Sequence, residues 1–296
     1  MTKEDKITII HHLLRAMIMT GFALYIIDLV RSGSMTLYIA PRMVLYVKLS
    51  AIGLYATAIY LLYSAVQVWV GNRTAAHDCD HEPSPSVIKN TLIYGLFILP
   101  LIMGFLLPDT MLGSTAASKK GISLNGTGSF VIPENAEAQP FPDADNTDLD
   151  ALFPADEYTA SYARLGKRLY GLNEIVIPEK QYMETLTALD LYRDNFIGKT
   201  VEISGFVYRQ EGMGTSQLAV SRFAMNCCSA DSLPYGLMIE NPQAADYDDD
   251  VWLNVRGTVT VGIFEGNPIV ILKAAQIKTI TPPSTPYVYP DYEFDL

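Results

Sequence analysis

The sequence predicts two parts, an α-helical membrane region with three spans and a C-terminal α+β or all-β domain that forms a small OB-like barrel. The division rests on hydropathy and charge. Residues 1–108 hold 8 Lys/Arg and 6 Asp/Glu among long apolar stretches, whereas residues 109–296 hold 13 and 26. An apolar, slightly basic half followed by a strongly acidic half is not one globular domain. Alternating apolar stretches separated by turn residues in the second half predict the barrel.

The membrane region is predicted to cover residues 1–112, with spans at about 7–30, 43–70 and 87–107. Each stretch is long enough to cross a hydrocarbon core of ~30 Å at a rise of ~1.5 Å per residue. Three such stretches in the first third of the chain disfavour the alternative, buried helices of a soluble protein. The first is followed by further apolar stretches and by no small-residue cleavage site, so we expect no cleavable signal peptide.

The orientation in the membrane is weakly encoded, because Lys and Arg near the span ends are evenly divided. Four lie on the side of the N-terminus and four on the other side, where the last two are Lys119 and Lys120. Positive charge favours the cytoplasmic side when it lies close to a span. Since Lys119 and Lys120 lie furthest from a span, we expect a cytoplasmic N-terminus. The protein is then a multi-pass protein of the cell membrane whose soluble domain is extracytoplasmic.

Beyond the spans, residues 113–150 are rich in Ser, Gly, Ala, Asn, Pro and acids, which predicts a flexible linker. The soluble OB-like domain is expected at 151–282, and residues 283–296 form a Pro- and Tyr-rich irregular tail. Within the domain, residues 174–177 are a short strand candidate. A helix is expected at 178–192, because Pro suits a first helical position.

A β-rich stretch follows this helix. Glycines inside two of its strands, Gly205 and Gly257, suit the sharp coiling of a small barrel. The five predicted strands are residues 200–208, 217–226, 237–240, 251–263 and 268–280.

The adjacent cysteines Cys227 and Cys228 are the sharpest local feature. Neighbouring α-carbons lie ~3.8 Å apart, whereas ordinary disulfides need ~4.4–6.8 Å, so a bridge between them would be strained and easily reduced. The pair is therefore either a soft-metal site with Asp231 as an oxygen ligand, a redox-labile vicinal disulfide, or two small buried hydrophobes. Both sulfurs can serve one site only if the chain turns there, which Asn226 and Ser229 favour.

A second candidate metal site lies in the loop between spans two and three. His77, Cys79 and His81 alternate, so an extended loop would place all three on one side. Imidazole and thiolate suit zinc, copper or nickel. The alternative is a solvated polar loop that binds no metal, because the spacing is not that of a standard zinc finger.

Several function classes are excluded. Three cysteines are too few for a disulfide scaffold. The acidic half disfavours nucleic-acid binding, which is built on Lys and Arg. The chain carries no hydrolase, kinase or dinucleotide-binding pattern, and we expect it not to be an enzyme.

Several motifs together resemble one family. They are the run Gly198–Tyr208, a Cys-Cys-x-Ala-Asp core inside residues 222–231, and a Trp-x-x-Val-x-Gly stretch at 252–257. The combination resembles YcgQ-type bacterial membrane proteins over essentially the whole chain. This family is described as permease subunits that work beside a larger multi-span permease. The resemblance implies functional positions at Arg222, Cys227, Cys228 and Asp231, with Gly236, Trp252 and Gly257 as further motif positions.

These observations predict a membrane-anchored accessory subunit of a permease system. Its soluble domain would bind or present a cargo, a transition-metal ion such as zinc, and its partners would be a multi-span permease subunit and membrane lipid. Two alternatives stay open. One is a cell-surface thiol–disulfide redox protein, which would lack the usual Cys-x-x-Cys spacing. The other is a scaffold without chemistry that holds a partner permease in place.

Overall fold

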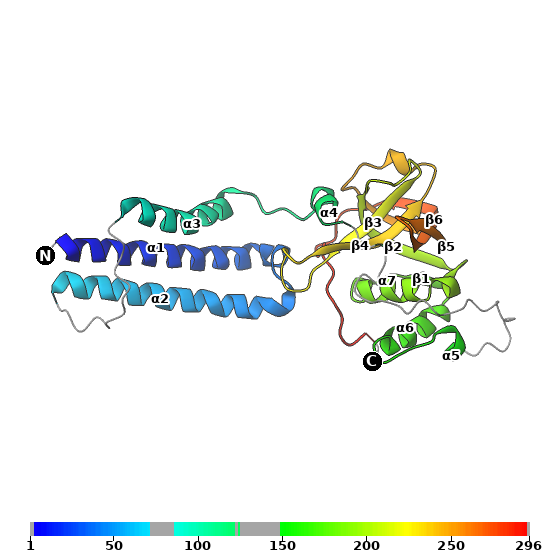
Figure 1. Ribbon diagram of the computed structural model, residues 1–296, viewed down its shortest axis with the longest axis horizontal. Helices are drawn as coiled ribbons and strands as arrows, with labels where there is room; N and C mark the ends of the chain where they lie inside the picture. Colours follow the sequence, from blue (N-terminus) through cyan, green and yellow to red (C-terminus); the bar gives the residue numbers. More distant parts are fainter. Residues whose placement is uncertain (1–2, 72–85, 122–123, 125–148, 295–296) are drawn as a thin grey trace. The chain divides into compact units, whose positions relative to one another are not determined.

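A computed structural model describes residues 3–71, 86–121, 124 and 149–294 (Figure 1). The chain forms two compact units, Met1–Thr110 and Met111–Leu296.

The first unit consists of three long helices, α1 (Lys3–Ser32), α2 (Val44–Val70) and α3 (Val87–Leu106). The short 3-10 helices η1 (Ser34–Leu37) and η2 (Pro41–Met43) join the first two. Each long helix is sufficiently long and apolar to cross a membrane. The three predicted spans are therefore confirmed as three apolar helices.

Helices α1 and α2 pack along a seam of alanines. Ala16 and Ala23 of α1 are buried, as are Ala51, Ala58 and Ala65 of α2. The spacing of seven residues keeps each set on one helix face, and small side chains let two helices approach closely in a membrane. The outward faces carry the large apolar side chains, which is the distribution expected of helices surrounded by lipid or by other spans.

The second unit is built on a six-stranded sheet with short helices (Figure 1). All six strands lie where the sequence predicted one, within a few residues at each end. Helices α4, α5 and α6 were not predicted, and α4 lies in the stretch 113–150 that was predicted to be a flexible linker. The elements are α4 (Ser114–Lys120), α5 (Leu149–Leu152), α6 (Ala160–Tyr170), β1 (Glu174–Val176), α7 (Tyr182–Leu191), η3 (Arg193–Phe196), β2 (Thr200–Tyr208), β3 (Gln217–Ala224), β4 (Leu233–Glu240), η4 (Ala244–Asp246), β5 (Trp252–Phe264) and β6 (Asn267–Thr279).

The sheet has the strand order β1-β2-β3-β4-β6-β5, and β2 also pairs with β5. The pairings β1–β2 and β4–β6 are parallel and the others antiparallel. Strands β2 to β6 thus form a closed ring of pairings. Opposite the step from Arg256 to Gly257, Ala275 of β6 is the extra residue of a bulge, in a stretch of β5 that pairs with both β2 and β6.

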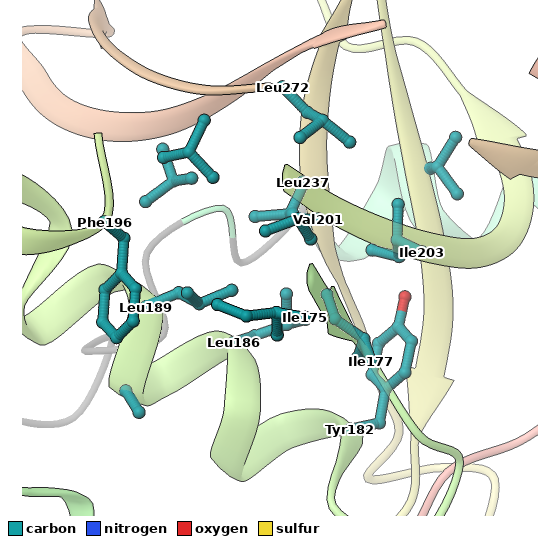
Figure 2. Packing of buried hydrophobic residues seen from close by; sticks show 14 of the residues in the cluster. Ile175, Ile177, Tyr182, Leu186, Leu189, Phe196, Val201, Ile203, Leu237 and Leu272 are labelled. Atoms are coloured by element: carbon teal, nitrogen blue, oxygen red, sulfur yellow. The ribbon is translucent and has the colours of Figure 1, made fainter. Parts of the chain in front are cut away.

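The core lies between the sheet and helix α7. Leu186 and Leu189 of α7 face Ile175 of β1 and Val201 of β2, and Leu237 of β4 lies beside them (Figure 2). All five side chains are buried. In the first half of β2, buried residues alternate with partly exposed ones, so one face of this strand points inward and α7 covers it.

The C-terminal segment after β6 is irregular but packed. Tyr287 and Val288 are buried. Val288 pairs with the end of β3, donating from its N–H to the carbonyl of Phe223 at 2.9 Å and accepting from the N–H of Met225 at 2.9 Å. The segment therefore lies along β3 up to the point where that strand ends.

Glu184 of α7 is buried, and one carboxyl oxygen accepts the N–H of Asp291 at 2.9 Å. Burial raises the pKa of Glu184 above its ordinary value of 4.5. The folded state therefore holds this proton more tightly than the unfolded state, and stability falls as pH rises from 4.5 through the raised value. We expect Glu184→Gln to remove this fall. The melting temperatures of the variant and the unaltered protein are compared at pH 4 and at pH 7.5. The increase caused by the substitution should be larger at pH 7.5. An equal difference at both values would contradict the prediction.

Candidate functional site

The predicted turn at the adjacent cysteines is present. Strand β3 ends at Ala224, Met225 is still buried, and the chain then reverses over residues 226–232 before β4 begins. Ser232 closes the turn, since its side chain is buried and its Oγ donates to the carbonyl of Ser229 at 2.7 Å.

The carboxylate of Asp231 organises this turn. It accepts the N–H groups of Cys227 at 2.7 Å, Asn226 at 3.2 Å and Cys228 at 3.4 Å. The N–H of Asp231 in turn donates to the carbonyl of Cys228 at 3.1 Å. A carboxylate that accepts three successive amides in this way fixes the backbone of the turn.

This backbone brings the two sulfur atoms to one side. They lie 3.7 Å apart. Together with a carboxylate oxygen of Asp231 they form a group whose ligand atoms all lie within 4.8 Å of one another. Among the described residues no other cluster of three or more His, Cys, Asp or Glu has this spacing. Cys227 is exposed and Cys228 is half-buried, so the cluster can be reached from solvent.

Hydrogen bonding tunes the protons of the cluster. The bond with Asp231, and then the contact with Cys228, raises the pKa of Cys227 to about 11. Partial burial alone would raise the pKa of Asp231, but the bonds from the Cys227 side chain and three backbone amides hold it below its ordinary value. At neutral pH the cluster is therefore a carboxylate that shares a thiol proton.

The geometry fits a tetrahedral thiolate-binding metal. Zinc–sulfur bonds of ~2.3 Å at tetrahedral angles place two sulfurs about 3.8 Å apart, which matches the separation here. Cys227, Cys228 and Asp231 would supply three ligands and leave a fourth position open.

Arg222, also singled out by the sequence, is buried in β3. Its guanidinium donates to Glu179 at 2.9 Å, to the carbonyl of Pro286 at 3.3 Å and to the carbonyl of Thr285. It lies 5.6 Å from the centre of the Trp252 ring. Arg222 is thus a structural clasp between β3, the segment just before α7 and the C-terminal segment, and these hydrogen bonds do not include the cysteines.

The two motif glycines also have structural roles. Gly236 of β4 lies opposite Ser221 of β3, and Gly257 of β5 lies opposite the bulge in β6. A Cβ on Gly236 would overlap the carbonyl oxygen of Val220, and one on Gly257 would overlap that of Lys273. Both positions require a residue without a side chain.

Two further outcomes concern residues outside this cluster. His77, Cys79 and His81 lie outside the described residues, so the second predicted metal site stays a prediction. Lys120, which was considered only as a charge near the third span and not as a site residue, contacts the turn. Its ammonium donates to the carbonyls of Ser229, Ala230 and Ser232. No local pattern could have revealed this contact, because more than a hundred residues separate its partners.

Comparison with known proteins places the chain. Residues 14–123 match the DUF1980 N-terminal domain and residues 152–290 the DUF1980 C-terminal domain. The UPF0703 protein YcgQ of Bacillus subtilis (strain 168) is 27% identical over 292 residues, which covers 93% of this chain and 98% of that protein. The chain belongs to the YcgQ-like family.

A second relative of this YcgQ-like chain comes from Streptococcus mutans serotype c and is named "Putative two-component membrane permease complex subunit". It is 26% identical over 200 residues, covering 66% of this chain and 72% of that protein. No solved structure matches the chain. The cysteine turn lies in the C-terminal domain match, whereas Lys120 lies in the N-terminal one.

Proposed function

We propose that this protein is an accessory subunit of a membrane permease complex, and that its soluble unit binds a transition-metal ion as cargo at Cys227, Cys228 and Asp231. The observation that carries the metal assignment is the 3.7 Å separation of the two sulfurs beside the Asp231 carboxylate. The name of the Streptococcus mutans relative supports the permease context.

The accessory role follows from the membrane unit. The described residues hold three apolar helices, two of them packed on each other through alanines, and three helices are too few to enclose a pathway alone. Their outward apolar surfaces suit lipid and the spans of a multi-span permease partner. We place the soluble unit on the extracytoplasmic side, because the counts of Lys and Arg are equal and Lys119 and Lys120 lie furthest from a span.

The ring of pairings among β2 to β6 supports an OB-like barrel for the soluble unit, a finer description than a six-stranded sheet. Such folds often bind nucleic acid, but fold alone does not determine function. The net negative charge of residues 109–296 argues for a cationic cargo instead.

An open fourth position suits a cargo that is taken up and released, since structural zinc sites are closed by four protein ligands. Metal binding must displace the thiol protons, so affinity should rise with pH.

The rival function, thiol–disulfide exchange, is less well supported. Exchange needs a thiolate as nucleophile. The raised pKa of Cys227 keeps its sulfur protonated at neutral pH, whereas reactive cysteines have lowered values. A bound metal ion supplies its own positive charge and can deprotonate the same thiol.

The test is zinc binding by the full chain in detergent, measured by competition with a chromophoric chelator. We expect one tight site that Cys227→Ser or Cys228→Ser weakens tenfold or more, because one of three ligands is lost. Cys79→Ser is the matched control, because it removes the remaining thiol from the other candidate site. Tight binding that persists in the Cys227→Ser, Cys228→Ser double variant would refute the assignment, and full loss with Cys79→Ser would move the site to the loop.

A further inference from the structure

The segment after the third span is anchored on the soluble unit. The N–H of Leu112 donates to the hydroxyl of Tyr287 at 2.9 Å, and the Oγ of Ser114 donates to Asp250 at 2.8 Å. Ala117, in the middle of α4, is fully buried. Residues 111–121 therefore form a membrane-proximal strap that belongs to the soluble unit in structure and follows the third span in sequence.

The last helical residue of this strap, Lys120, holds the cysteine turn. Its Nζ donates to the carbonyls of Ser232 at 2.7 Å, Ala230 at 3.0 Å and Ser229 at 3.2 Å. An ammonium group has three donors, and all three are directed to this turn. A surface lysine that only stays hydrated would not converge on three carbonyls of one short segment.

The turn is thus held from two sides. Asp231 collects the N–H groups at the beginning of the turn, and Lys120 collects the carbonyls around Asp231 itself. Adjacent side chains of an extended chain point to opposite faces, so the two sulfurs share one side only while the turn keeps this shape. Lys120 therefore acts on the sulfurs through the backbone.

We infer that Lys120 is a positioning residue of the metal site and that docking of the strap and metal binding strengthen each other. The inference rests on the metal site proposed above. If the docked strap favours the metal-binding shape of the turn, the bound metal must favour the docked strap by the same factor. Metal binding then stabilises the docked form of the segment that follows the third span in sequence.

The experiment compares Lys120→Met with Lys119→Met in the full chain. Each change removes one exposed positive charge, and the two lysines are adjacent, but it is Lys120 that donates to the carbonyls of the turn. We expect Lys120→Met to bind zinc about tenfold more weakly, the lower end of the effect of outer-shell partners. Lys119→Met should bind as the unaltered protein does, and Lys120→Arg should recover part of the affinity.

Hydrogen exchange gives a second readout that a general loss of stability would not reproduce. Zinc should slow exchange of the amides in residues 114–121 in the unaltered protein and in Lys119→Met, and leave them unchanged in Lys120→Met. Equal zinc affinity and equal protection in both variants would overturn the inference.

Alkylation separates this inference from the proposed function. If the unaltered protein binds no zinc, the metal proposal fails. The positioning role of Lys120 is then tested by the alkylation rates of Cys227 and Cys228 without metal. Faster alkylation in Lys120→Met than in Lys119→Met would support the positioning role of Lys120, whereas equal rates would refute it. An unchanged melting temperature of the membrane unit controls for misfolding of the whole chain.

Discussion

Replacing Gly236 with alanine is expected to unfold the soluble unit at temperatures that leave the unaltered protein folded. Gly236 lies in β4 directly opposite Ser221 of β3. An added Cβ would overlap the carbonyl oxygen of Val220 and the Oγ of Ser221, and it would lie 2.8 Å from the Ser221 Cα. Two of these atoms belong to a paired backbone that cannot move aside without breaking the ladder. We expect a loss of about 3 kcal/mol in the free energy of unfolding, the upper range for overpacking.

For a unit of this size such a loss lowers the melting temperature by about 10 °C. Thermal unfolding followed by the fluorescence of Trp252, with Trp69 replaced by Phe, measures the soluble unit alone. Gly214→Ala is the matched control, because the nearest atom to its new Cβ is the flexible side chain of Gln217 at 3.6 Å. A Gly236→Ala protein that melts with the control would show that β3 and β4 do not pack as closely as described.

The need for a glycine at position 236 shows what local sequence patterns cannot predict. Apolar alternation located β4, but the strand begins at Leu233 and not at Leu237. Pro234 lies opposite Phe223 of β3 in the paired sheet. Alternation reports which face of a strand is buried. The atom that excludes a side chain from Gly236 lies in another strand, and no local pattern names it.

The same limit explains which parts of the site and the fold could be predicted from the sequence and which could not. The adjacency of Cys227 and Cys228 and the nearby Asp231 are local, so the turn could be predicted from chain geometry alone. Helix α6 was missed because Ala163 and Gly166, two of its buried positions, are too small to give a clear apolar period. The contacts of Lys120 form only when residues distant in sequence meet.

Replacing Arg222 with methionine is expected to destabilise the soluble unit by about 2–3 kcal/mol. Methionine keeps most of the apolar stem beside Trp252 but leaves the carbonyls of Thr285 and Pro286 without their donor. A buried acceptor without a partner costs ~1–3 kcal/mol. Breaking a fully buried ion pair would cost ~3–5 kcal/mol, but the side chain of Glu179 is 58% exposed and can return to water. The two unpaired carbonyls therefore account for most of the lost stability, and we expect about 2–3 kcal/mol and not the ~3–5 kcal/mol of a buried ion pair.

Glu179→Gln tests this division of the energy. It removes the negative charge, keeps an oxygen within reach of Arg222, and should cost less than ~1 kcal/mol, as expected for an exposed ion pair. Urea unfolding of both variants measures the difference. Equal losses would show that the ion pair, and not the two carbonyls, holds the clasp.

Arg222→Met should also loosen the cysteine turn. The C-terminal segment that Arg222 holds at Thr285 and Pro286 continues to Tyr292, whose hydroxyl donates to the side chain of Asn226 at 3.1 Å. Without the Arg222 contacts the segment is held by fewer hydrogen bonds, among them those of Val288 and Asp291, so its contact beside Cys227 should be weaker. Alkylation of Cys227 should therefore be faster in Arg222→Met than in Glu179→Gln, at a temperature where both variants remain folded. Equal rates would separate the clasp from the turn and leave Lys120 and Asp231 as the groups that hold the cysteines in place.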